Sequence, residues 1–212
     1  MTDTPALLAL MQWLSPAFPT GAYACSHGLE WVISTGAVYD AASVQSWLAD
    51  VVQHGTGWQD AVMLATALRP DADFAALADY ARALAPSRER LAETLDQGSA
   101  FARALRALGH SIVAAPLPVA LGQAAVALAL PSQTVIALYL HAFAANLVSV
   151  AVRFVPLGQS DGQRVLAALH PLILHLAKAA VLADLADITT AALAADLAAM
   201  RHETMDIRIY RT

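Results

Sequence analysis

The strongest constraint on the fold is a run of 19 residues without a formal charge, 134–152, followed by a nearly uncharged segment, 165–183. A run of this length can span a bilayer or form a central helix that is buried on all sides. The first run carries His141, Asn146 and Ser149, which are costly in lipid unless they find polar partners. It lacks both an aromatic belt at its ends and a basic loop cluster to orient it. The sequence therefore favours a buried core helix.

Composition agrees with a large buried core. Of the 212 residues, 58% are hydrophobic and only 14% are charged, which is more apolar than an average soluble domain. A chain of this length is expected to form one domain. Its apolar content exceeds what one core needs, so we expect a soluble homodimer with surface left for other partners. The net charge of −5 argues against nucleic-acid binding.

Cysteine content and charge distribution bear on the compartment. Cys25 is the single cysteine, so an internal disulfide framework is excluded. Residues 1–68 contain no Lys or Arg, so we expect no positively charged leader of a secretory signal. Both features predict a cytoplasmic protein.

The pattern of helix formers and breakers predicts an all-α fold. Ala and Leu dominate the chain, while Pro and Gly fall mainly between periodic segments. Asp40 and Ser87 are good N-caps, and Pro131 suits a first helical turn. We therefore expect residues 1–212 to form a single-domain globular bundle of roughly ten helices with a flexible C-terminal tail. The expected helices cover about 5–14, 28–34, 40–54, 58–68, 73–84, 87–108, 118–130, 131–155, 159–184 and 191–205.

A search for catalytic or metal-binding motifs gives none that is complete. There is no Gly-rich phosphate loop and no Gly-x-Ser-x-Gly turn. Cys25 and His27 have the start of a metal-site spacing but lack further ligands. His170 and His175 are separated by about 140° around a helix axis, which places them on different faces. We expect no catalytic residue, no metal ligand and no bound cofactor.

One charged segment is interpreted as solvent-exposed. Glu89, Arg90, Glu93 and Asp96 follow one another along the expected helix 87–108. Charges at helical spacing usually mark a solvated face. The sequence thus predicts a binding module and not an enzyme.

Residues 201–212 are the least ordinary stretch of the chain. They contain three arginines, a His-Glu pair and a Tyr, although chain termini generally fray. Ile207, Ile209 and Tyr210 are few anchors against an ordering cost of about 1–2 kcal/mol per residue. We expect the tail to be poorly ordered alone and to fold against the N-terminal segment when a partner binds. Arg208 would then lie near Tyr23.

Three blocks of sequence resemble the UreF family of urease accessory proteins, in order and over nearly the whole chain. Residues 10–38 read LMQWLSPAFPTGAYACSHGLEWVISTGAV, with a Pro-x-Gly turn, an aromatic and Ser-x-Gly-Leu-Glu. Residues 151–163 read AVRFVPLGQSDGQ, and the tail reads RHET followed by RIYRT. The family differs at Cys25 and His27, so no metal role is transferred to that pair.

The resemblance implies an all-helical, dimeric, non-enzymatic scaffold. Such a protein would join a UreD/UreH-like protein and the GTPase UreG to the urease apoprotein and help nickel insertion. It would act as a maturation chaperone that can modulate GTP hydrolysis by its partner, while nickel and GTP are handled by the partners. A runner-up from another class is an all-helical nickel-binding or nickel-permeating membrane protein.

Matching positions imply partner-binding residues. They are Tyr23, Ser26, Gly28, Glu30, Arg153, Arg201, His202, Glu203 and Arg208. Some have ordinary structural explanations as well. The side chain of Tyr23 would be half-buried and would pack against its neighbours. The charge of Arg153 would complement the dipole at a helix C-terminus, and Glu30 would be a solvated helix residue.

Overall fold

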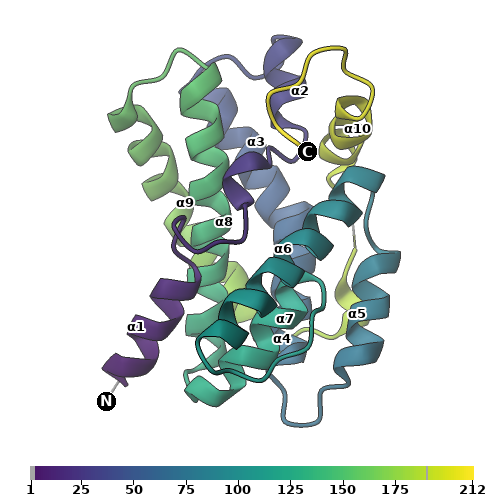
Figure 1. Ribbon diagram of the computed structural model, residues 1–212. Coiled ribbons are helices and arrows are strands. Elements are labelled where there is room, and N and C mark those ends of the chain that lie inside the picture. The colour runs from purple at the N-terminus through teal and green to yellow at the C-terminus, as the bar shows by residue number, and fades with distance from the viewer. Residues whose placement is uncertain (1–2, 190) are drawn as a thin grey trace.

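The computed structural model describes residues 3–189 and 191–212, and within them the chain is all-helical (Figure 1). The predicted all-α class is confirmed. The α-helices are α1 (Thr4–Trp13), α2 (Leu29–Ser34), α3 (Ala41–His54), α4 (Thr56–Ala67), α5 (Phe74–Ala83), α6 (Arg88–Ala107), α7 (Leu117–Ala125), α8 (Ser132–Phe154), α9 (Gln159–Leu182) and α10 (Leu193–His202). Short 3-10 turns are η1 (Ala22–Ala24), η2 (Val126–Leu128) and η3 (Leu185–Asp187).

The predicted helix starts rest on side-chain caps. Asp40 accepts a hydrogen bond from the amide of Ser43 at 2.8 Å, and Ser43 in turn accepts the amide of Asp40. Ser87 accepts the amide of Arg90 at 3.2 Å. Each cap satisfies amides that the first helical turn leaves unpaired. The predicted starts of α3 and α6 are therefore confirmed.

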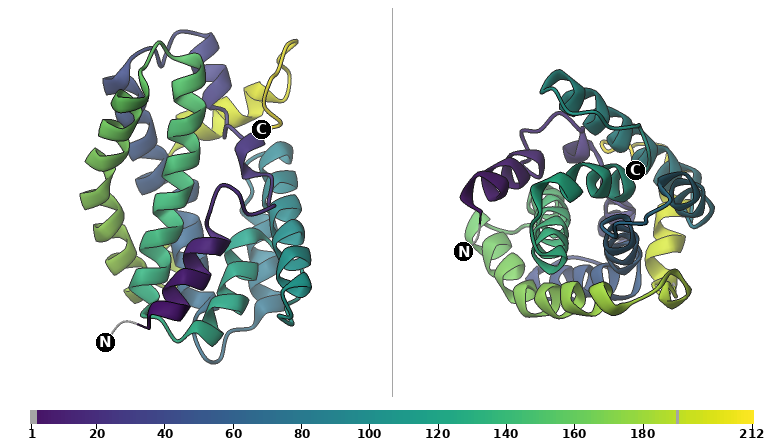
Figure 2. Two further views of the ribbon diagram at one scale, coloured as in Figure 1. Left: turned by 60° about the vertical axis from the view of Figure 1, so that its left-hand side comes forward. Right: turned by 90° about the horizontal axis from the view of Figure 1, so that it is seen from below.

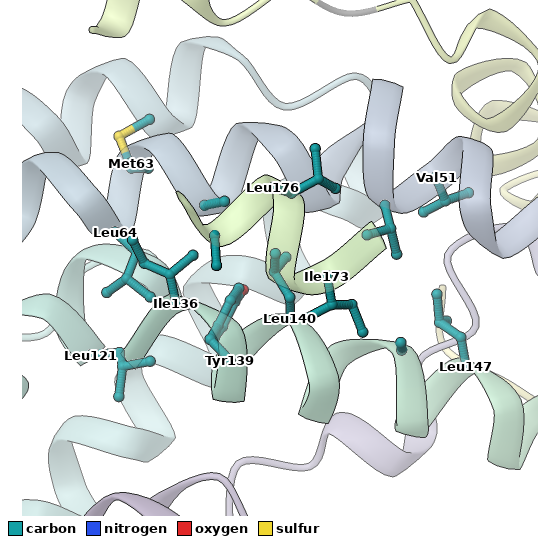
Figure 3. Packing of buried hydrophobic residues seen from close by; sticks show 14 of the residues in the cluster. Val51, Met63, Leu64, Leu121, Ile136, Tyr139, Leu140, Leu147, Ile173 and Leu176 are labelled. Atoms are coloured by element: carbon teal, nitrogen blue, oxygen red, sulfur yellow. The ribbon is translucent and has the colours of Figure 1, made fainter. Parts of the chain in front are cut away.

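The two longest helices, α8 and α9, form an antiparallel hairpin against which α3 and α4 pack (Figure 2). Ile136, Leu140 and Ala144 of α8 are each 0% exposed, and the first two lie among side chains of α4 and α9 in Figure 3. By length and composition alone both helices could cross a membrane. The interior position of these α8 side chains agrees with the expected core helix.

Asn146 shows how the polar residues of α8 are accommodated. Its side-chain amide donates to the carbonyl oxygens of Ala22 at 3.0 Å and Cys25 at 3.3 Å. A polar group that would be costly in lipid thus finds partners inside the protein. The same contacts fix the N-terminal segment against the middle of the bundle.

One end of the bundle brings α2, the N-terminal end of α6 and α10 together (Figure 1). Gly28 precedes α2 with φ of 75°, and a Cβ there would lie 2.6 Å from the backbone nitrogen of Ala199 in α10. Only glycine permits both this left-handed conformation and this close approach. The chain after α10 then turns back toward η1, so the C-terminal tail meets the segment between η1 and α2 at this end, whereas α1 and the N-terminus lie near the other end (Figure 1).

Candidate partner-docking site

The C-terminal tail lies along the segment between η1 and α2. The amide of Arg211 donates to the carbonyl of Ala24 at 2.8 Å, and the amide of Ser26 donates to an oxygen of Thr212 at 2.7 Å. Tyr210 and Thr212 are buried, with 6% and 5% of their surface exposed. Within a single chain the tail therefore already lies against the N-terminal segment. Docking of the tail upon partner binding stays a prediction.

The structure differs from expectation in what holds the tail. It packs within a single chain, without a partner, because polar contacts supply what its few apolar side chains do not. Arg208 does not lie at Tyr23 but donates to Glu89, with an Nη1–Oε1 distance of 2.5 Å. Tyr23 is 63% exposed. In this single chain a carboxylate is the better partner for the guanidinium, and the Arg208–Tyr23 proximity expected on partner binding stays a prediction.

Glu30 is the acceptor that holds the tail backbone. Its Oε1 accepts the amide of Ile209 and its Oε2 the amide of Tyr210, both at 2.9 Å. Burial raises the pKa of this carboxyl, but the amides of Tyr210 and Ile209 and then His202 outweigh burial and leave the pKa below its usual value. Glu30 is 5% exposed, so its reading as a solvated helix residue is wrong.

His202 links Glu30 to Glu89. The imidazole is 0% exposed, with Nε2 3.1 Å from Oε2 of Glu30 and Nδ1 2.7 Å from Oε2 of Glu89. Only an imidazole with protons on both nitrogens can donate to both carboxylates. The last turn of α10 is thereby joined to α2 and to the start of α6.

Glu93 forms a second buried centre one turn further along α6. It is paired with Arg90, accepts the hydroxyl of Thr212 at 2.5 Å and lies 2.7 Å from Nε2 of His27. Burial alone would raise the pKa of Glu93, but the charge of Arg90 and then His27 hold the pKa far below its usual value. We call Glu30, Glu89 and Glu93, with the groups they bind, the carboxylate cluster.

The carboxylate cluster corrects the interpretation of α6 as a solvated helix. Arg90 and Glu93 are only 7% and 5% exposed, because the tail and the segment before α2 cover this face. Asp96 does remain exposed and pairs with Arg211 at 3.0 Å. The periodicity of charges could not distinguish a solvated face from one covered by charged partners.

A cavity of about 100 Å³ lies beside Glu93, between α6, α8 and the N-terminal segment. Asp60 lines it and accepts the hydroxyl of Tyr139 at 2.6 Å. Burial raises the pKa of Asp60 to about 6. His27 Nδ1 and Arg90 Nε are buried here without a protein partner among the described residues, which is typical of a site that holds water.

Cys25 and His27 lie in the buried interior beside Glu93. Burial raises the pKa of the Cys25 thiol to about 11, which keeps it protonated and unreactive. Within the described residues no three His, Cys, Asp or Glu side chains are grouped as metal ligands would be. His27 instead packs edge-on against Phe143, with ring centroids 4.8 Å apart.

The predicted partner-binding residues divide into an inner and an outer set. Ser26, Gly28, Glu30 and His202 are buried, and Glu203 accepts the amide of Glu89 at 3.1 Å. The exposed members are Tyr23, Arg153, Arg201 and Arg208. The half-buried packing considered for Tyr23 is wrong, since the ring stands in solvent.

Arg153 occupies the last turn of α8, where a cation complements the helix dipole. Its Nη1 also lies 3.4 Å from the hydroxyl of Tyr210. The expected position at a helix end is thus observed, whereas the proximity to the tail was not predicted. Any partner contact by the nine residues stays a prediction.

Sequence reasoning missed two groups at this end of the molecule. Glu89, Arg90 and Glu93 were assigned to solvent, and the terminal Thr212 was not considered. Arg90 and Glu93 pair with each other, but their remaining charged partners and that of Glu89 lie more than 60 positions away, where the local sequence does not indicate them. Ile207 and Ile209, 81% and 71% exposed, were counted as anchors but face outward.

Comparison with known proteins decides the family. The family model described as UreF matches residues 38–170. A urease accessory protein UreF from Cereibacter sphaeroides (strain KD131 / KCTC 12085) is 64% identical over 98% of this chain and 99% of its own. The chain belongs to the UreF family of urease accessory proteins. A UreF from Paracoccus denitrificans is 53% identical over 100% of this chain and 99% of its own.

A third relative, the UreF of Roseobacter denitrificans, is 50% identical over 99% of this chain and 96% of its own. The matched length therefore takes in nearly the whole chain. The UreF family name describes an accessory protein of urease, which implies a role other than that of an enzyme. The residues that hold the tail therefore belong to a urease accessory protein.

Proposed function

We propose that this UreF chain is a non-enzymatic scaffold that joins a UreD/UreH-like protein and the GTPase UreG to the urease apoprotein during nickel insertion. It acts in the cytoplasm as a homodimer and modulates GTP hydrolysis by its partner. It carries no resident cofactor, because nickel and GTP are handled by the partners. Family membership supports the role in urease maturation, and the docked tail supports the scaffold.

The main evidence for a scaffold function is the solvent-exposed face of the C-terminal tail. Glu30 binds the tail backbone from one side, and Ile207 and Ile209 point away from it, 81% and 71% exposed. Large exposed apolar side chains on an ordered segment are typical of protein interaction sites. Arg208 lies between them in the sequence, and Tyr23 of η1 is 63% exposed. Tyr and Arg are enriched at binding hot spots. We assign this face to the UreD/UreH-like partner.

A pull-down with the UreD/UreH-like protein tests the assignment. The compared chains are wild type, an Ile207→Ser/Ile209→Ser double variant, Arg208→Ala, and a chain ending at Met205. We expect each change to weaken capture and urease activation at least tenfold. Leu182→Ser is the matched control, since Leu182 is also 81% exposed but lies at the end of α9. Unchanged capture by the truncated chain would reject the tail as a docking element.

Light scattering of the purified chain without detergent tests the dimer and the membrane alternative together. The proposed scaffold predicts a monodisperse homodimer at micromolar concentration. A soluble monomer would reject the dimer. Recovery only in detergent would favour the membrane protein, for which α8 and α9 have sufficient length.

A further inference from the structure

Two histidines face each other across the α8–α9 hairpin, far from the carboxylate cluster along α8. The rings of His141 and His170 have centroids 5.4 Å apart and planes inclined at 45°. Within the described residues neither imidazole has a hydrogen-bond partner. His141 is half-buried and His170 is exposed, so the pair lies at the protein surface.

The way in which α9 packs along α8 explains why His141 and His170 are close to each other. Gly162 of α9 lies against α8, where an added Cβ would meet Val152 at 2.6 Å and Val148 at 3.1 Å. Counting from this contact, His170 is eight residues beyond Gly162 and His141 is seven residues before Val148. Seven to eight residues are about two helical turns, so both histidines lie at the same level of the hairpin. The packing of α8 on α9 therefore brings the two positions close together.

The separation of the rings fits one shared metal ion. Metal–nitrogen distances to histidine are about 2.0–2.1 Å, so two imidazoles bound at a tetrahedral angle place their ring centres about 5 Å apart. We propose that His141 and His170 form a two-histidine site for a divalent late transition metal ion, with water in the remaining positions. Imidazole nitrogen suits Zn²⁺, Ni²⁺ and Cu²⁺, whereas Mg²⁺ and Ca²⁺ prefer oxygen.

Two protein ligands make an exchangeable site and not a structural one. Structural zinc sites use four protein ligands, and among the described residues no third His, Cys, Asp or Glu joins this pair. His175 is five residues beyond His170 on another face of α9 and does not contribute. Such a site takes up and releases a metal ion and does not hold it tightly.

The site is a property of this chain alone and does not depend on the proposed partners. The test titrates the tag-free full chain with Ni²⁺ and, separately, Zn²⁺ in competition with a metal indicator dye. We expect one metal per chain, and at least tenfold weaker binding in His141→Gln and in His170→Gln. His175→Gln is the matched control and should bind like wild type. Equal binding by wild type and the two pair variants would overturn the proposal.

A measurement on the wild type removes dependence on variant folding. Bound Zn²⁺ should protect His170 from modification by diethyl pyrocarbonate, whereas His175 should stay reactive, as read by mass spectrometry. Equal modification of His170 with and without Zn²⁺ would also overturn the site. Failure here would leave capture of the UreD/UreH-like protein intact, so the two proposals can be told apart.

Discussion

The carboxylate cluster and the α8–α9 hairpin hold this molecule together by different means. The cluster joins α2, α6, α10 and the tail through buried charges whose partners lie far apart in the sequence. The hairpin joins two neighbouring helices through close apolar packing, with Gly162 against Val148 and Val152. A buried charge that loses its partner is strongly destabilising, whereas an apolar contact is shared among many neighbours. The two regions should therefore respond differently to mutation and to pH.

The largest loss of stability is expected on substitution of Glu93. Glu93→Ala leaves Arg90 buried without its carboxylate, which should lower the free energy of unfolding by about 3–5 kcal/mol at pH 7. Urea denaturation measures it. Asp96→Ala is the matched control on the same helix, because its exposed pair with Arg211 should contribute at most about 1 kcal/mol. Equal losses in both variants would show that the cluster is no more than surface charge.

The contribution of Glu93 to the free energy of unfolding should also depend on pH. Its folded-state pKa lies below the unfolded value, so its stabilisation is present above the ordinary glutamate pKa of about 4.3 and is lost as the pH falls below it. The difference in the free energy of unfolding between wild type and Glu93→Ala should therefore become smaller below about pH 4. A constant gap down to pH 2 would argue against this origin.

In the hairpin, Leu140→Ala should cost about 3 kcal/mol, because Leu140 is 0% exposed and its loss leaves a cavity. No charge changes, so the loss should be the same from pH 4 to pH 8. Urea denaturation at several pH values compares it with Glu93→Ala. A loss that varied with pH as strongly as that of Glu93→Ala would erase the contrast between the two regions. Leu182→Ala, at an 81% exposed position on α9, is the control.

Asp60 should show the opposite pH behaviour from Glu93. Burial raises its folded-state pKa to about 6, above the unfolded value, so folding is penalised as the pH rises from about 4 to 6. Asp60→Asn keeps an acceptor for the hydroxyl of Tyr139 and removes the buried charge. We expect the variant to be more stable than wild type by about 2 kcal/mol at pH 7, and equal to it near pH 4. Thermal unfolding at both pH values checks this, and lower stability at pH 7 would contradict it.

The two regions also differ in how far the sequence predicted them. The uncharged composition of residues 134–152 predicted α8, and the capping residues Asp40 and Ser87 predicted the starts of α3 and α6. These predictions were possible because both signals are local in the sequence. The buried state of Glu93 depends on Thr212, which the turn after α10 brings there, and on His27 of the segment before α2. A charge pattern within one helix carries no information on such partners. The pair of His141 and His170 was missed for the same reason, since spacing was considered only within α9.

The smallest loss of stability is expected for Arg208→Ala. This variant distinguishes a role of the tail in stability from a role in partner binding. Arg208 bonds Glu89, but its side chain is 40% exposed, so water screens the pair and Arg208→Ala should cost only about 1 kcal/mol. That loss should shrink in 1 M salt, where exposed charges are screened within about 3 Å. Arg208→Lys, which keeps the charge but not the planar fork, is the matched control. If Arg208→Ala abolishes capture of the UreD/UreH-like protein at so small a cost in stability, the guanidinium itself contacts the partner. A stability loss as large as that of Glu93→Ala would instead show that the Arg208–Glu89 pair holds the tail in place, and weak capture would then report only a detached tail.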